Sequence, residues 1–508
     1  MEARSIPTGN AYEGAIAELE ETIRILKTGA SLKKDHVDLE KLIEERQRET
    51  SRLLLEAAFA SRGSGDVGDQ VEGSDSVSRT HKRKGTTHVK SIFGEVELSR
   101  TGYGKPGSES LFPFDGGLNL SGDSYSLNLR SLLGQEVVKG SFDDAIAAVE
   151  ARTGVALPKR QAEELVRKAA VDFDTFYERR LLDPTEQAMM ERQPILVLTT
   201  DGKGIVMRPE SLPEATRKRA EESESHLKKR LSKGEKRNAK RMAQVASLYS
   251  IGQHVRRPEQ VAGIEPKSEV KPPRPVGKRV WASVEKEQDA VIGDLFNEAE
   301  ARDPYKKMDW VVLVDGQLSQ LYRVQEEAER KKAKITVIVD IVHVIEYVWK
   351  AARCLYEETD PKGEEWVTEH LLQILRGEVK TAAAGMRRSA TFRNLKKDDR
   401  DAIDKCADYL HKNAPYLEYD RHLQRGYPIA TGVIEGACRY LVKDRMDITG
   451  ARWGLKGAEA VLKLRSLHAS GDLKEYWQFH NQQELERNHE SKYEKPAVLR
   501  RKGLHLLK

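Results

Sequence analysis

Cysteine, aromatic residues and long apolar runs are scarce in this sequence. Only 3 of its 508 residues are cysteine, and 6% are aromatic. Cys354, Cys406 and Cys438 form no Cys-x-x-Cys pair, which argues against a disulfide framework and a thiolate zinc site. No stretch reaches the roughly eighteen apolar residues that a membrane-spanning helix needs, so no membrane association is expected.

The bulk composition predicts a soluble protein with several domains. Hydrophobic residues make up 38% of the chain and charged residues 33%, as in soluble proteins with long polar helices. The polar N-terminus lacks the basic-then-apolar layout of a secretory signal, so we expect a cytoplasmic location. A chain of this length exceeds what one hydrophobic core normally serves.

Positive charge is concentrated in one segment, although the net charge is only +5. Between Lys228 and Arg241 the only acidic residue is Glu235, which gives a local field suited to phosphate groups. A solvated basic helix is an equally good interpretation of such a run. The residues that we assign here to DNA binding are Lys228, Lys229, Arg230, Lys233, Lys236 and Arg237.

The N-terminal part of the chain has three patterns. Apolar residues recur three or four apart within residues 1–61, which predicts an exposed helical arm. Residues 62–78 are rich in Gly, Ser and Asp, which predicts a flexible linker. In the small segment 79–135, alternation of apolar and polar residues around Gly94 predicts a β-hairpin.

Residues 136–190 are typical of two short helices joined by a turn at Gly154 and Pro158. This pattern predicts a helix-turn-helix-like region, in which the cations Lys159, Arg160, Arg167 and Lys168 could approach phosphates. Packing of two short helices without DNA contact explains the same pattern equally well.

A mixed α/β sheet is predicted in residues 191–345. The continuous apolar runs 195–200, 310–314 and 335–339 are typical of strands buried on both faces. Two further candidate strands are 205–207 and 245–250, and a helix after each later strand indicates parallel crossovers. The chain beyond these strands is predicted to be helical.

Asp201, Asp315 and Asp340 directly follow the three apolar runs. In a sheet of three antiparallel strands followed by crossovers, the first strand is central and the fourth pairs beside it. Asp201 and Asp315 are then neighbours, and Asp340 lies one strand further away. Adjacent ionised carboxylates are stable only when a cation bridges them, and oxygen ligands favour Mg²⁺ or Mn²⁺. Asp201 and Asp315 are each followed by glycine, and an Asp-Gly pair on its own is also common in turns.

Glu435 is the best candidate for a third carboxylate, because it begins a helix that can pack on the sheet. Arg439 and Lys443 follow at four-residue steps, so in an α-helix they share its face and could hold DNA phosphates. First-turn dipole chemistry is the alternative explanation for Glu435. Two metal ions about 3.5–4 Å apart could serve both DNA hydrolysis and rejoining.

Other residues are secondary candidates. His343 follows Asp340 by about one helical turn and could act near the site, although a packed core histidine is an equally good interpretation. Trp453, beside Arg452 in a predicted loop, could stack on a DNA base while Arg452 contacts the backbone.

The ordered motifs resemble a known family. They are Asp201-Gly-Lys-Gly, Lys233-Gly-Glu-Lys-Arg, Lys278-Arg-Val-Trp-Ala-Ser283, Val314-Asp-Gly316, Asp340-Ile-Val-His343, and Gly432-Val-Ile-Glu435 through Ala451-Arg-Trp453. Together they look like the DDE transposases of the ISKra-four family, bacterial insertion-sequence enzymes distantly related to the Mutator-like group. The resemblance runs from about Thr87 to Phe479, and the ordered set is specific although each motif alone is weak.

The resemblance implies a ribonuclease H-like α/β core in residues 191–345 and 428–480, with an all-helical insertion in 346–427. It also implies a mainly helical N-terminal DNA-binding region and two Mg²⁺ ions, for which Mn²⁺ substitutes, held by Asp201, Asp315 and Glu435. Asp340 and His343 match the Asp-x-x-His signature of the group and are auxiliary. The partners would be the element's terminal inverted repeats, target DNA and further copies of the chain in a dimer or higher synaptic oligomer.

One departure from the family pattern and two alternative functions accompany this interpretation. Relatives often carry cysteine pairs after the Phe-Gly-Glu-Val strand, but Tyr103 to Pro113 has none, which puts a zinc site in doubt. The basic end of the chain, 481–508, is expected to be a tail. A ribonuclease H-like structure-specific nuclease and a catalytically silent, element-derived DNA-binding regulator are the competing functions.

Overall fold

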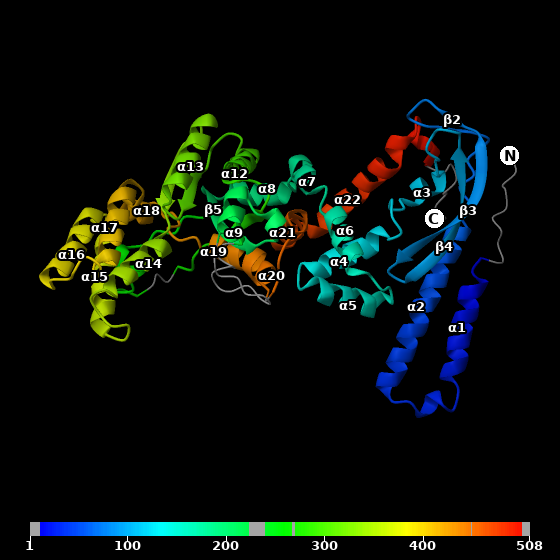
Figure 1. The fold of residues 1–508 in the computed structure, drawn as a ribbon, viewed down its shortest axis with the longest axis horizontal. Coiled ribbons are helices and arrows are strands. Elements are labelled where there is room, and N and C mark those ends of the chain that lie inside the picture. The colour runs from blue at the N-terminus through cyan, green and yellow to red at the C-terminus, as the bar shows by residue number, and fades with distance from the viewer. Residues whose placement is uncertain (1–10, 223–238, 267–269, 449, 500–508) are drawn as a thin grey trace. The chain divides into compact units, whose positions relative to one another are not determined.

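A computed structural model describes residues 11–222, 239–266, 270–448 and 450–499 (Figure 1). The chain forms two compact units. The first, here called unit 1, holds the chain up to Arg179 and from Asp472 onward, and the second, unit 2, holds Arg180–Gly471. Within the described residues, no helix combines the length and the apolar character needed to cross a bilayer.

Unit 1 contains most of the N-terminal elements. Its helices are α1 (Glu13–Leu26), α2 (His36–Ala60), α3 (Pro113–Leu118), α4 (Leu127–Val137), α5 (Phe142–Thr153), α6 (Lys159–Ala169), α7 (Phe173–Arg179) and α22 (Leu473–Asn488). Its strands are β1 (Val71–Glu72), β2 (Ser78–Arg79), β3 (His81–Ser91) and β4 (Gly94–Gly104). The predicted helical arm is confirmed as the packed pair α1 and α2.

The predicted β-hairpin is also confirmed and is longer than expected. Strands β3 and β4 pair in antiparallel register from His81 opposite Gly104 to Ser91 opposite Gly94. Gly94 supplies the turn with φ of 120°, a conformation that favours glycine. Apolar residues near the turn, such as Val96 and Leu98, are buried against Phe114 and α2.

The segment 62–78 differs from the predicted flexible linker because its backbone and side chains are packed. Val71 is buried in a cluster with Tyr103 and Tyr493. The Tyr103 hydroxyl donates to Asp66 at 2.9 Å and accepts from the Val67 backbone N–H at 2.9 Å. Glycine and serine content predicted disorder, but long-range partners order this segment.

The end of the chain also differs from the predicted basic tail. Helix α22 extends to Asn488 and belongs to unit 1. The buried Arg130 of α4 pairs with Glu484 at 2.8 Å, and the Tyr476 hydroxyl donates to the Ala169 carbonyl at 2.7 Å. The predicted boundary at residue 480 is therefore misplaced, since the two units divide at Gly471.

The predicted pair of helices around Gly154 is confirmed as α5 and α6. Gly154 ends α5 with φ of 70°, and Pro158 precedes α6. Lys159, however, pairs with Asp143 at 2.8 Å, and Lys168 pairs with Asp123 at 2.8 Å. Arg167 also pairs with Glu164 at 3.1 Å, so three of the four cations predicted to face DNA here have carboxylate partners.

Unit 2 is built on a five-stranded sheet in the order β7-β6-β5-β8-β9. The strands are β5 (Ile195–Val206), β6 (Lys240–Ile251), β7 (Val276–Ser283), β8 (Asp309–Val314) and β9 (Ile335–Val339). β5 is antiparallel to β6, β6 to β7, and β5, β8 and β9 are parallel. The predicted mixed α/β sheet is confirmed, with the first strand central and the strand before Asp315 beside it.

Two strand assignments need correction. Residues 205–207 do not form a separate strand, because β5 continues through Gly202 and Gly204 to Val206 in unbroken pairing with β6. The third antiparallel strand is β7, which was not predicted. Ser466 and Ser470 of α21 form hydrogen bonds with the Ala282 and Val280 backbone N–H groups, so this helix covers the outer edge of β7.

The rest of the described regular structure in unit 2 is helical. This includes every regular element in the predicted helical insertion, residues 346–427. The helices are α8 (Pro184–Glu191), α9 (Glu214–Glu221), α11 (Pro258–Val261), α12 (Gln288–Arg302), α13 (Leu318–Arg330), α14 (Ile341–Ala352), α15 (Pro361–Leu375), α16 (Val379–Phe392), α17 (Asp401–Asn413), α18 (Tyr419–Gln424), α19 (Gly432–Ala437), α20 (Asp444–Met446) and α21 (Leu455–Ser470). A π-helical turn, η4 (Cys438–Lys443), joins α19 to α20.

Candidate active site

Three aspartates occupy one row at the carboxyl ends of the parallel strands. Thr199 of β5 is opposite Leu313 of β8, which is opposite Ile338 of β9. Asp201, Asp315 and Asp340 each lie two positions further along these strands or just beyond them. Since side chains two apart on a strand share a face, the register brings the three carboxylates toward the same edge of the sheet.

Asp201 is half-buried and is held by two donors. The Gly202 backbone N–H donates to Oδ1 at 2.6 Å, and the Cys438 thiol donates to Oδ2 at 3.2 Å. Burial, followed by Asp201 itself, raises the pKa of the Cys438 thiol far above its ordinary value. The thiol therefore stays protonated and donates, which ties the central strand to the segment that follows Glu435.

Asp315 lies at the tight turn where β8 leads into α13. Its Oδ1 accepts from the Gln317 backbone N–H at 2.8 Å, and its carbonyl accepts from the Tyr409 hydroxyl at 2.8 Å. Gly316 has φ of 83°, and a Cβ there would lie 2.8 Å from the Tyr409 hydroxyl oxygen. This position thus requires glycine, and α17 of the helical insertion supports the turn.

Asp340 is buried and caps α14. Its Oδ1 accepts from the Val342 backbone N–H at 2.8 Å, and its Oδ2 accepts from both the backbone N–H and the hydroxyl of Thr431. Burial raises the pKa of Asp340 to about 6 despite these donors, and Glu435 adds to the rise. Thr431 immediately precedes α19, so Asp340 joins the last strand to the helix that carries Glu435.

Glu435 groups with Asp340 and His343. One oxygen or nitrogen atom from each of these three side chains lies within 4.8 Å of the other two. Among the described residues, the predicted set of Asp201, Asp315 and Glu435 does not form such a group. The structure therefore groups Glu435 with the two residues that the sequence analysis treats as auxiliary.

The donor chemistry of this region fits a divalent cation. Carboxylate oxygens with one imidazole suit Mn²⁺ and, through the oxygens, Mg²⁺. The His343 Nδ1 atom is buried and has no hydrogen-bond partner among the described residues. A cation would also favour ionisation of Asp340, whose pKa burial has raised.

A cavity of about 540 Å³ opens beside Asp315. Asp315 and His343 line it from the sheet side, and Tyr409 and Lys412 line it from α17. Lys412 has no ion-pair partner among the described residues, unlike Lys405 in the same wall, which pairs with Asp401 at 2.5 Å. The helical insertion therefore places an uncompensated cation next to the carboxylates.

The predicted DNA-binding residues differ in whether and where the structure places them. The basic run Lys228, Lys229, Arg230, Lys233, Lys236 and Arg237 lies outside the described residues. Arg439 and Lys443 lie in the π-helical turn and not in the predicted regular α-helix. Both are exposed, and the Arg439 guanidinium is 3.8 Å from Asp444.

The structure does not support base stacking by Trp453. The residue is only 8% exposed, its indole N–H donates to the Met446 carbonyl at 2.9 Å, and the Arg445 guanidinium lies 4.9 Å from the ring centre. A free aromatic face is needed for stacking. Arg452 next to it is exposed and could still contact a backbone phosphate.

Sequence reasoning missed three residues of this region: Cys438, Thr431 and Tyr409. Each acts through a contact with a residue about 90 or more positions away. No local pattern marks such contacts. Cys438 is buried, and Cys354, Cys406 and Cys438 are all free thiols.

Comparison with known families adds no further identification: no family model matches this chain, and no curated protein is similar to it.

Proposed function

We propose that this chain is a DDE transposase that cleaves insertion-sequence ends and joins them to target DNA. The observation that carries this proposal is the row of Asp201, Asp315 and Asp340 at one sheet edge, with Glu435 on a helix tied to that edge. Carboxylates from separated parts of a chain, gathered at the ends of parallel strands, are a common basis for metal-dependent phosphoryl transfer. The motif resemblance points to the same chemistry.

Asp201, Asp315 and Glu435 would hold the metals, with Asp340 and His343 beside them. The chemistry that Mg²⁺ ions, or Mn²⁺ in their place, would supply when bound there is activation of a water or DNA 3′-hydroxyl and stabilisation of the leaving oxygen. Lys412 attracts the phosphodiester into the cavity beside Asp315. Tyr409 fixes the Asp315 backbone, and Cys438 orients Asp201 through its hydrogen bond.

The remaining parts of the proposal are a ribonuclease H-like core, inverted-repeat and target DNA as partners, and a synaptic dimer or larger assembly. Two element ends must be held together for joining, which favours more than one copy of the chain. The proposed location is the cytoplasm, at the nucleoid.

A strand-transfer assay tests the proposal. The full chain is incubated with Mg²⁺, labelled duplexes from the DNA on either side of its gene, and a target plasmid. Joined product is expected from wild type and from Glu365→Gln, a control at an exposed position of α15, but not from Glu435→Gln. Cleavage without joining would support the nuclease, and binding without cleavage would support the regulator.

A further inference from the structure

The exposed half of the β3–β4 hairpin in unit 1 carries a strongly basic strand. From His81 to Lys90, every ionisable side chain is cationic or histidine, and the residues from His81 to Thr86 are exposed. A charged edge strand can simply prevent pairing with other chains. That role is served by charge of either sign, so it does not explain why acids are absent from the whole strand.

The same face of this hairpin contains a cleft. His81 is opposite Gly104, and Arg83 is opposite Gly102. The side chains of β3 therefore face glycines of β4, which have no side chain to fill the space. The cleft has a volume of about 280 Å³, and Lys105 and Phe112 complete its lining. A Cβ at residue 102 would lie 2.6 Å from Phe112, so the cleft depends on glycine there.

The charges of this hairpin cleft are uncompensated. No acidic side chain lines it, and Arg83 and Lys105 have no ion-pair partner among the described residues. Lys82, on the opposite face, pairs with Asp66 at 3.0 Å. The cleft therefore has the positive potential of an anion-binding surface.

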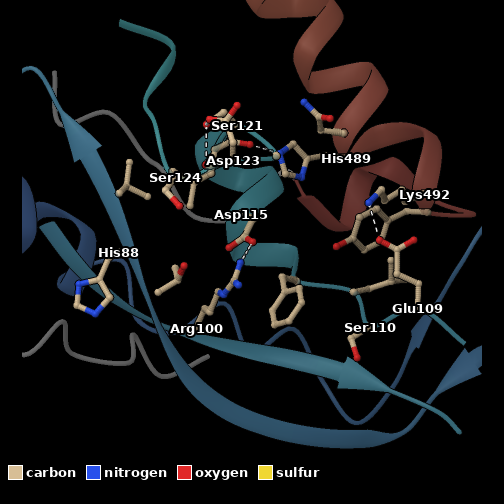
Figure 2. Close-up of a pocket in the computed structure, with 18 residues that line it drawn as sticks. His88, Arg100, Glu109, Ser110, Asp115, Ser121, Asp123, Ser124, His489 and Lys492 are labelled. Carbon is tan, nitrogen blue, oxygen red and sulfur yellow. Dashed lines mark hydrogen bonds and ion pairs between the residues drawn. The ribbon is translucent and has the colours of Figure 1, made fainter. Parts of the chain in front are cut away.

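A neighbouring cavity of unit 1 differs from the hairpin cleft in the pairing of its charges. It has a volume of about 300 Å³, and its cations are paired: Arg100 with Asp115, and Lys492 with Glu109 (Figure 2). The Arg100 guanidinium also lies 4.0 Å from the centre of the Phe112 ring. Arg100 is thus neutralised, whereas Arg83 and Lys105 keep their unpaired charge in the hairpin cleft.

We propose that the hairpin cleft binds the phosphate backbone of nucleic acid through Arg83, Lys105 and His81. An arginine fork and an ammonium group suit phosphodiester oxygens, and the cleft has too little apolar surface to anchor a folded protein. Paired strands are an established means of contacting DNA. This surface goes beyond the proposed catalysis, because a nuclease or a regulator would need it equally.

Binding of a fluorescent DNA duplex to the full chain, in EDTA and over a range of salt concentrations, tests this. Arg83→Gln with Lys105→Gln should weaken binding about tenfold near physiological salt and lower the salt-dependence slope by about 2. Ser110→Glu, which adds an acid beside the cleft, should weaken it as well. Arg24→Gln with Lys27→Gln removes the same charge from α1 and its end and should bind like wild type.

Unchanged affinity and slope in the cleft variants, with melting curves like wild type, would overturn the proposal. So would equal displacement of DNA by polyglutamate at matched charge, since that would indicate a site for acidic proteins. Glu435→Gln should bind as wild type does in this assay. Loss of strand transfer in that variant therefore reports on the metal site alone.

Discussion

The thiol of Cys438 lies 3.2 Å from Oδ2 of Asp201, across 237 positions of sequence. This bond links the central strand to the π-helical turn that directly follows the Glu435 helix. π-Turns inside helices are frequent at functional sites. Here the first residue of the turn, Cys438, contacts the carboxylate of Asp201 and so connects the end of the Glu435 helix to the central strand.

Cysteine reactivity should separate the three thiols. Burial raises the pKa of Cys438 far above its ordinary value and that of Cys406 to about 12, so neither forms a thiolate near neutral pH. Cys354 is only half-buried. Brief treatment of the native protein with iodoacetamide should label Cys354 alone, as measured by peptide mass spectrometry.

The denatured protein, in which all three cysteines should react, is the control. Rapid labelling of Cys438 in the native state would mean that it does not donate to Asp201. Cys438→Ser retains a donor and should preserve DNA cleavage better than Cys438→Ala.

Asp315→Ala should abolish DNA cleavage, by at least about 100-fold, because a predicted metal ligand is lost. DNA binding should be nearly unchanged or tighter, since removing negative charge eases the approach of phosphate. Cleavage gels and an anisotropy titration with the same duplex measure the two effects. Full cleavage by Asp315→Ala, together with an inactive Asp340→Asn, would assign the metal to the Asp340, His343 and Glu435 group.

Gly316→Ala should destabilise the protein by about 1–3 kcal/mol, because the residue has positive φ and its Cβ would meet Tyr409. Displacement of the adjacent Asp315 should also weaken Mn²⁺ binding. Denaturant unfolding and isothermal titration measure these changes. Gly293→Ala in α12, where no neighbouring atom lies within 4 Å of the added Cβ, is the matched control and should be stabilising by roughly 1 kcal/mol.

The sequence predicted the parallel strands correctly because their side chains are largely apolar. Residues 195–200 of β5 and 310–314 of β8 are buried on both faces, and β9 is partly to fully buried, so each appears as a continuous apolar run ending at an aspartate. β7 was missed because Lys278 and Arg279 interrupt its apolar pattern. Arg279 is nevertheless only 8% exposed, since it pairs with Glu298 and lies 4.6 Å from the Trp281 ring.

The arrangement of the candidate site was harder to predict than its strands. The row of aspartates follows from strand order, which topology rules supply. The position of Glu435 depends on Thr431 and Cys438, whose contacts arise only in the folded chain. Likewise, the segment 62–78 is ordered by Tyr103 and Tyr493, and no local pattern reveals such distant partners.

Asp115 of unit 1 should make stability depend on pH. Burial is the largest effect on its carboxyl and raises the pKa from 3.8 to about 6, even though Arg100 opposes the rise. The folded state therefore holds this proton more tightly than the unfolded state, and Asp115 stabilises the fold when protonated. That contribution is complete below about pH 4 and is lost as the pH rises through 6.

Between about pH 4.5 and 7.5 the loss should amount to about 2 kcal/mol of unfolding free energy. Urea unfolding of wild type and Asp115→Asn at both pH values measures it, because other carboxyls titrate alike in the two proteins. The difference in stability, wild type minus variant, should be more favourable to wild type at the lower pH. A difference that is constant or grows with pH would mean that the Arg100 guanidinium, and not burial, dominates the ionisation of Asp115.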